Sequence, residues 1–360
     1  MAKKKSSSSN LKKRGISKFK KIFIASLIIC LISGFGLIYF YYKSVYVHNI
    51  NLKNQEPYIY IKTGSNFEDV KNLLAEKNVL LNVASFEWLA KQKNYVDRIK
   101  PGKYKLENGM TNNQLVNKLR AGNQEPVNIT INNIRTKYEL ISKVSKILEA
   151  DSNQLKSILE NDHELEKIKL NSDNIISLFI PNTYQFFWNT SAEEFFARMI
   201  NESDKFWNKL RLEKLGKLNL SRAEVITLAS IVEKESNYFP ERPIIASVYL
   251  NRVRKGMKLQ ADPTVVYAVG DFSINRVLDI HLKKDSPYNT YMYQGLPPGP
   301  ISIPSANAID AVLKNEKTPY IYFCAKEDFS GKHNFAANYI QHSNNANKFR
   351  KALNKRKIYK

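Results

Sequence analysis

The sequence has few cysteines and none of the motifs that hold a catalytic metal. Of its two cysteines, Cys30 lies in a long apolar run and Cys324 lies far downstream, so no intrachain disulfide is expected. No His-Glu-x-x-His pattern occurs, and His333 and His342 are spaced wrongly for two ligands on one helical face. We therefore expect neither a metal nor another cofactor.

A serine nucleophile of the penicillin-binding type is also lacking. The Ser-x-x-Lys pattern of those acyl enzymes occurs only near the N-terminus, at Ser9–Lys12 and Ser17–Lys20. Cys324 adjoins Tyr322 and Phe323, a setting that fits a small core residue better than a nucleophile. Acyl-enzyme chemistry is therefore disfavoured.

Acidic residues are outnumbered throughout the chain. Its 56 Lys and Arg against 33 Asp and Glu give a net charge of +23, and residues 1–21 contain no acidic residue at all. These residues carry nine of the positive charges, which leaves +14 for the remainder. Such an excess is typical of nucleic-acid-binding proteins. Nucleic acid is nevertheless excluded as a partner by the topology that the next segment predicts.

Residues 22–42 form a run of 21 residues without a charge, which is long enough for a helix to cross the hydrocarbon core of a bilayer. Four aromatic residues at 39–42 close the run, as expected at a membrane interface. Lys and Arg precede it and few follow, so we expect a single-pass helix in the cytoplasmic membrane with residues 43–360 on the outer, periplasmic side. A cleaved signal peptide is the alternative, but no small-x-small cleavage site is present. The lipid bilayer and anionic wall polymers are then the expected partners.

The sequence patterns predict an α+β protein in five parts. They are a basic cytoplasmic tail at 1–21, a transmembrane helix at 22–42, a polar stalk at 43–56, a small α+β domain at 57–125 and a larger mixed α/β domain at 126–360. The small domain has a strand–helix–helix–strand order that resembles a LysM-type fold, which implies binding of N-acetylglucosamine glycans. A spacer domain without a ligand of its own is the alternative.

The stretch at 220–240, LSRAEVITLASIVEKESNYFP, contains the strongest catalytic candidate. Ser221 is followed three residues later by a glutamate, so a capping box predicts that a helix begins here. Its apolar stripe consists of Val225, Leu228 and Val232. The next position on that stripe is Glu235, a carboxyl where a core residue would stand.

A carboxyl at the end of an apolar stripe is expected to act as a general acid. Partial loss of water disfavours its charged form and raises its pKa toward neutral pH. Glu233 lies about 200° away around the helix, so both carboxyls cannot point into one cleft. We assign catalysis to Glu235 and supporting roles to Glu233 and Ser236. The alternative is that both glutamates are surface charges at the end of a helix.

Two downstream segments, 258–270 and 286–305, are rich in turn formers, amides, hydroxyls and tyrosines. We predict strands and loops that line a sugar cleft, because amides and hydroxyls bond sugar hydroxyl and acetamido groups while tyrosine faces stack on sugar rings. The predicted substrate-binding residues are Asn251 from the preceding helix and Gln260, Asp262, Thr264, Tyr288, Asn289, Thr290 and Tyr291.

Taken together and in order, six segments resemble the endolytic murein transglycosylases, the YceG-like family. They are LFIPNTYQF at 178–186, LASIVEKES at 228–236, the pair Asn251 and Arg252, LQADPTVVYA at 259–268, SPYNTYMYQGLPPGPI at 286–301, and PYIYF with GKHNF near the end. The resemblance implies a membrane-anchored lyase with a lysozyme-like catalytic domain. Such an enzyme cuts peptidoglycan glycan strands internally, between N-acetylmuramic acid and N-acetylglucosamine, and leaves a 1,6-anhydromuramoyl end. It also implies action on newly made strands, beside peptidoglycan synthases and division proteins.

In that family the catalytic residue is the glutamate immediately before Ser or Thr in the EKE motif, which here is Glu235 before Ser236. The chain departs from the family pattern at four places. They are Asn182 for Asp, Ser305 for Gly, Ala337 for Thr, and NIRTK at 133–137 for an EGW-type segment.

Two other functions stay open from the residues themselves. A hydrolysing muramidase would need a second carboxylate, for which Asp262 is the best candidate. A non-enzymatic wall-binding or division scaffold would use the small domain and would make Glu235 incidental.

Overall fold

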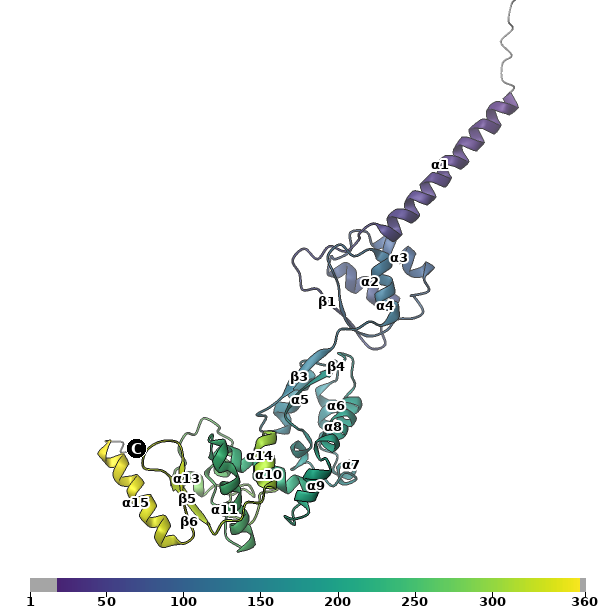
Figure 1. Cartoon of the computed structure of the whole chain (residues 1–360). Helices are drawn as coiled ribbons and strands as arrows, with labels where there is room; N and C mark the ends of the chain where they lie inside the picture. Colours follow the sequence, from purple (N-terminus) through teal and green to yellow (C-terminus); the bar gives the residue numbers. More distant parts are fainter. Residues whose placement is uncertain (1–17, 357–360) are drawn as a thin grey trace, which may run out of the picture. The chain divides into compact units, whose positions relative to one another are not determined.

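The computed structural model describes residues 18–356, and the chain divides into two compact units, Met1–Glu125 and Pro126–Lys360. Helices and short strands alternate in both units, which confirms a mixed helix and strand fold (Figure 1). Of the predicted basic tail, residues 1–17 lie outside the described residues.

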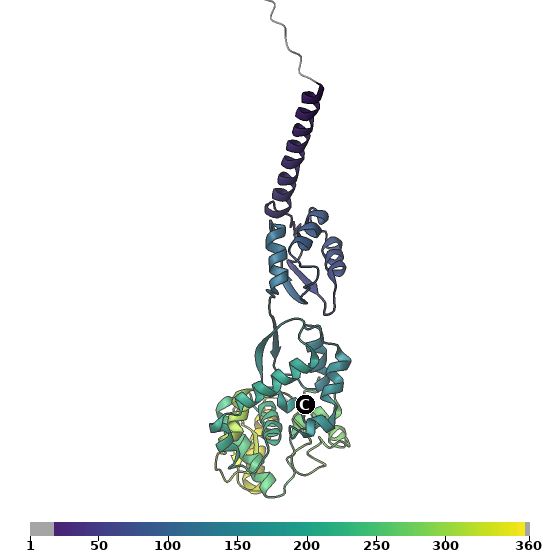
Figure 2. The same cartoon turned by 90° about the vertical axis from the view of Figure 1, so that its right-hand side faces the viewer.

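The first unit consists of one long helix followed by a small α+β domain. Its elements are α1 (Lys18–Tyr46), β1 (Tyr58–Ile61), α2 (Phe67–Glu76), α3 (Val83–Gln92), β2 (Gly102–Lys105) and α4 (Asn112–Ala121). α1 is uninterrupted (Figure 2), and among the described residues it alone is long and apolar enough to cross a membrane. β1 and β2 pair antiparallel, with Tyr58 opposite Lys105. The strand–helix–helix–strand order is therefore as predicted.

The segment at 43–56, predicted as a short polar stalk, packs into the first unit. Val45 and Ile50 are buried, and Ile50 forms a β-bridge with Leu80. The side-chain amide of Asn112 donates to the carbonyl oxygen of Ser44 over 3.0 Å. The polar composition of the segment concealed these few apolar residues, whose burial outweighs its overall hydrophilicity.

The described residues of the second unit are mainly helical and form two strand pairs. Its elements are β3 (Val127–Ile131), α5 (Lys137–Ser145), α6 (Ser152–Leu159), α7 (Asp162–Glu166), η1 (Ile175–Leu178), β4 (Asn182–Phe186), α8 (Ala192–Phe206), α9 (Lys209–Leu215), α10 (Arg222–Glu235), η2 (Phe239–Glu241), α11 (Arg242–Arg254), α12 (Asp262–Val269), α13 (Asp279–Leu282), α14 (Ala306–Leu313), β5 (Tyr322–Ala325), β6 (His333–Ala336) and α15 (Tyr339–Lys355). β3 pairs antiparallel with β4, and β5 with β6.

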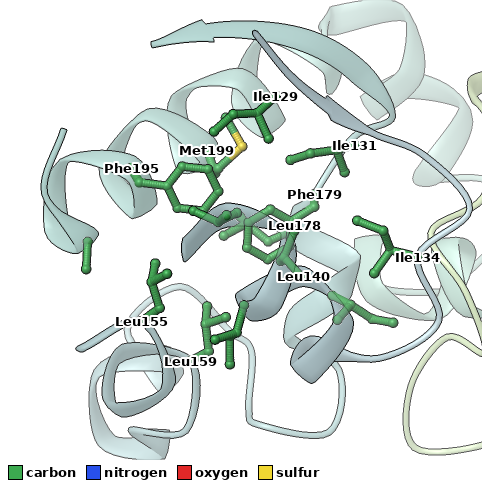
Figure 3. Packing of buried hydrophobic residues seen from close by; sticks show 14 of the residues in the cluster. Ile129, Ile131, Ile134, Leu140, Leu155, Leu159, Leu178, Phe179, Phe195 and Met199 are labelled. Carbon is green, nitrogen blue, oxygen red and sulfur yellow. The ribbon is translucent and has the colours of Figure 1, made fainter. Parts of the chain in front are cut away.

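Two hydrophobic cores organise the second unit. The first lies beneath the β3–β4 pair, where Phe179, Phe195 and Met199 meet Ile129 and Leu140 (Figure 3). The second core surrounds α10, which packs against α11 and α14. All residues from Val225 to Val232 are buried, so α10 is apolar on every side and not only along the predicted stripe. A helix enclosed in this way gives the residues at its end a rigid support.

The segment 258–270, predicted as strand and loop, contains the helix α12. Pro263 suits the first turn of a helix because the amide hydrogen that it lacks would have no intrahelical partner there. Gly270 ends the helix in a left-handed conformation with φ of 82°. The β-branched residues between Pro263 and Gly270 favour a strand. The proline at the start and the glycine at the end favour a helix, and a helix forms.

Candidate active site

The cap residues at both ends of α10 place Glu235 at its last turn. At the start, the backbone N–H of Ser221 donates to the Glu224 carboxylate over 2.7 Å, which confirms the predicted capping box. At the other end, Ser236 is the C-cap and is buried. Its hydroxyl oxygen accepts from the backbone N–H of Tyr238 over 3.1 Å. Ser236 therefore stabilises the turn that follows Glu235.

Glu235 lies on the wall of a cavity of about 530 Å³ in the second unit. Glu235 as a residue is half-buried, and the hydroxyl of Tyr249 donates to its Oε1 over 2.6 Å. Burial raises the pKa of Glu235 to about 7, and the nearby charge of Asp262 adds to this effect. The Tyr249 hydrogen bond and the charge of Arg252 oppose it. Near neutral pH this carboxyl can therefore both give and take a proton.

The raised pKa of Glu235 also predicts how stability changes with pH. The carboxyl ionises near its ordinary value of 4.5 when unfolded and near 7 when folded, so between these values the folded state binds more protons. Its contribution to the free energy of unfolding should fall as pH rises through this window, by on the order of 3 kcal/mol. Urea unfolding of the wild type and of Glu235→Gln should show stabilities that diverge with pH, with the variant ahead above pH 7. Parallel curves would contradict the raised pKa.

Of the predicted substrate-binding residues, Asp262 lines the same cavity as Glu235, and Tyr291 contacts Asp262. Asp262 is exposed on the cavity wall at the start of α12. The hydroxyl of Tyr291 donates to its Oδ1 over 2.6 Å. Burial and the neighbouring Asp262 raise the pKa of Tyr291, so the tyrosine stays a hydrogen-bond donor at neutral pH. Asp262 therefore offers an acceptor on the cavity wall, and the Tyr291 hydroxyl helps to hold it in place.

Three of the predicted substrate-binding residues hold the protein together instead. Thr264, Asn289 and Thr290 are buried. The hydroxyls of Thr264 and Thr290 lie 2.8 Å apart, and Thr290 also accepts from the backbone N–H of Ala261. Asn289 donates to the carbonyl oxygens of Leu282, at the end of α13, and of Lys284, at 2.9 and 2.8 Å. The bonds between Thr290 and the residues Ala261 and Thr264 hold the tyrosine-containing segment at 286–305 against the start of α12, and so they position Asp262.

The other predicted contacts lie outside the residues that line the cavity. Asn251 donates to the carbonyl oxygens of Thr318 and Tyr320 at 2.8 and 2.9 Å, which ties α11 to the chain before β5. Gln260 is exposed and has a positive φ of 49°. The centre of the Tyr288 ring lies 4.6 Å from the centre of the Tyr267 ring, and Tyr267 is one of the residues that line the cavity. Tyr288 therefore supports the cavity wall from behind.

Glu233 points away from Glu235, as the helical spacing predicted. Its carboxylate accepts from the hydroxyl and the backbone N–H of Ser305 at 2.5 and 3.1 Å. It also forms an ion pair with Arg242 over 3.3 Å, and Arg242 is only 3% exposed. Ser305 is the N-cap of α14, so Glu233 joins α10 to that helix and to α11. Its position is that of a structural residue.

Several residues that line the cavity or contact Glu235 had no predicted role. Tyr249 was missed because its position in α11 reads as core, and only the packing of α11 on α10 brings it to Glu235. The other missed residues at the cavity are the aromatic Tyr267 and Phe272 and the cationic Arg135, Lys234 and Arg276. The segment 271–277 lies between the two polar segments that were selected by composition. Its aromatic and cationic residues could have indicated from the sequence that this segment lines a binding cavity.

Comparison with known proteins identifies the family. The YceG-like family matches residues 59–348. An endolytic murein transglycosylase of Bacillus subtilis is 29% identical over 286 residues, which cover 75% of this chain and 79% of that protein. One of Streptococcus pneumoniae is 29% identical over 364 residues, which cover 90% of this chain but only 64% of that protein. A crystal structure of a YceG-like protein from Listeria monocytogenes matches 80% of this chain and 97% of its own, with 29% identity and a TM-score of 0.54. This chain therefore belongs to the YceG-like family.

Proposed function

We propose that this chain is an endolytic murein transglycosylase, a lyase that cuts peptidoglycan glycan strands internally between N-acetylmuramic acid and N-acetylglucosamine. The observation that carries the proposal is Glu235, a carboxyl with a pKa of about 7 on the wall of a cavity that also holds Asp262. Relatives that bear this name align with most of the chain, which supports the same activity.

One carboxyl suffices for the whole reaction. Protonated Glu235 gives its proton to the glycosidic oxygen, the bond from that oxygen to C1 breaks, and the muramoyl ring gains oxocarbenium character. The Glu235 carboxylate then removes the proton from the C6 hydroxyl as that oxygen bonds to C1. The products are a free hydroxyl on one sugar and a 1,6-anhydro ring on the other. Water is not consumed, and Glu235 ends protonated as it began.

The cavity wall offers contacts that suit this substrate. The rings of Tyr267 and Phe272 are apolar faces on which a sugar can stack. Asp262 supplies an acceptor for sugar hydroxyl or acetamido groups, and Tyr291, whose hydroxyl donates to Asp262, leaves its own oxygen as a second acceptor. Asp262 and Tyr291 are thus proposed to contact the substrate directly. Thr264, Asn289 and Thr290 are proposed to position the residues that do.

A hydrolysing muramidase is the second candidate, because Asp262 shares the cavity with Glu235 and would provide the second carboxylate. Mass spectrometry of the fragments formed in heavy-oxygen water separates the two reactions. We expect fragments with anhydro ends and no heavy oxygen, from the wild type and from Asp262→Asn alike, and a rate in Asp262→Asn within about tenfold of the wild type. Incorporated heavy oxygen that disappears in Asp262→Asn would establish the muramidase instead.

The proposed location is the cytoplasmic membrane. α1 would cross it once, with the N-terminus in the cytoplasm and the second unit on the outer side, in line with the Lys and Arg before this helix. The first unit is proposed to be LysM-like and to bind glycan. Synthases and division proteins are proposed partners. A labelled N-acetylglucosamine oligomer that fails to bind residues 43–125 would reduce the first unit to a spacer.

A further inference from the structure

The cavity of Glu235 carries three cations, Arg135, Lys234 and Arg276, against the two acidic residues Glu235 and Asp262. We propose that Arg135, assisted by Lys234 and Arg276, binds an anionic group, a carboxylate or a phosphate, that the glycan strand carries. This inference rests on the proposed function, since it names a feature of that substrate. These three cations would then select the substrate, and they take no part in the proton transfer.

The backbone around Arg135 is held on both sides. Asn133 accepts from the side-chain amine of Lys234 over 2.7 Å, which ties this loop to the last turn of α10. The carbonyl oxygen of Ile134 accepts from the backbone N–H of Ile303 over 2.7 Å. The N–H of Arg135 itself donates to the Glu139 carboxylate over 2.8 Å. Arg135 is therefore fixed in place one residue before α5 is capped.

The side chain of Arg135 is oriented but not neutralised. Its guanidinium carbon lies 4.2 Å from the centre of the Phe272 ring, a cation–π contact that occupies one face of the group. The Glu139 carboxylate is bonded to the backbone N–H of Arg135. Within residues 18–356 no ion pair involves Arg135. A guanidinium stacked in this way still presents its N–H edge, which matches the two oxygens of a carboxylate or phosphate.

The charge of the cavity favours an anion. When Glu235 is protonated, three cations face the single carboxylate of Asp262, which already accepts from Tyr291. The pKa of Lys234 is lowered, first by burial and then by the charge of Arg135. Two cations close together repel each other, and an incoming anion offsets that repulsion.

A glycan strand offers two sources for such a group. Peptide stems carry carboxylates, and a strand still joined to its lipid carrier carries a diphosphate at its end. Both present oxygens that a guanidinium can bind in pairs, so the chemistry is shared. Synthetic strands separate the sources. One kind bears stems with free carboxylates, one bears stems with amidated carboxylates, and one lacks stems but ends in the lipid diphosphate.

The test is the steady-state kinetics of Arg135→Gln on the three strands. We expect a KM raised about tenfold, with kcat within about twofold, only on strands with the matching anion. Arg135→Lys should recover part of the loss, and Arg276→Gln should show a smaller rise. Arg350→Gln, an exposed arginine of α15 that does not line the cavity, serves as the matched control. Thermal unfolding of each variant checks that it is folded.

Each possible result of these measurements either supports or contradicts an anion site at Arg135. An effect confined to free stem carboxylates, or to the diphosphate, supports the inference and identifies the source. An equal KM for Arg135→Gln and wild type on every strand overturns it, as does a loss confined to kcat. If the wild type cuts none of the strands, the proposed function fails separately. Equilibrium binding of the labelled strands then tests the anion site alone, and equal binding by wild type and Arg135→Gln would refute it.

Discussion

Glu235→Gln should lower the rate of glycan cleavage by at least about a thousandfold. Glutamine matches the size of the carboxyl and can still accept the hydrogen bond of Tyr249, which is 2.6 Å long in the wild type. It has no proton to give to the glycosidic oxygen and cannot take one from the C6 hydroxyl, so both halves of the reaction lose their catalyst. Single-turnover release of anhydro-ended fragments measures the effect.

The control for this variant is Glu213→Gln, an exposed glutamate of α9 that should retain full activity. Folding of Glu235→Gln is checked by its unfolding curve, which should lie at or above that of the wild type near neutral pH. A folded Glu235→Gln that still cuts glycan at close to the wild-type rate would remove Glu235 from the mechanism. The other glutamate of the EKE motif, Glu233, would then be the candidate.

Glu233→Ala should destabilise the protein by about 3 kcal/mol. The substitution removes the partner of Arg242, whose guanidinium is buried and lies 3.3 Å from the Glu233 carboxylate. It also removes the acceptor of the Ser305 N–H and hydroxyl at the start of α14. A buried charge without its partner is costly because protein supplies less solvation than water.

Urea unfolding at constant pH measures the loss for Glu233→Ala, with Glu213→Ala as the exposed control. The pH dependence of the remaining activity should match that of the wild type, because Glu233 is not the acid. A loss of stability below about 0.5 kcal/mol would show that the contacts of Glu233 contribute as little as surface ion pairs do. A shifted pH dependence would return a catalytic role to Glu233.

Local signals in the sequence were sufficient to predict α10 and its catalytic candidate. The capping box at Ser221 and the spacing of Val225, Leu228 and Val232 are short-range features, and the structure has the cap and buries all three apolar residues. The angular separation of Glu233 from Glu235 follows from helix geometry alone. What required the structure was the environment of each carboxyl.

The rest of the site depends on contacts between distant segments, which spacing cannot supply. Tyr249 reaches Glu235 only because α11 packs on α10. Asn251 and Thr264 have the composition of sugar-binding residues, yet their polar groups are used by carbonyl and hydroxyl groups of the protein. Arg135 stood in a segment noted only for its departure from the family pattern. Its place in the cavity follows from the bonds between its loop and α10.

The pH dependence of kcat/KM in the wild type and in Tyr249→Phe tests most directly whether Glu235 is the acid. In the wild type, kcat/KM should fall as pH rises through about 7, because the acid of the free enzyme must be protonated. Tyr249 lowers the pKa of Glu235 through its hydrogen bond, so removing the hydroxyl should move this fall to higher pH by about one unit. A fall at the same pH in both proteins would contradict the assignment of Glu235 as the proton donor.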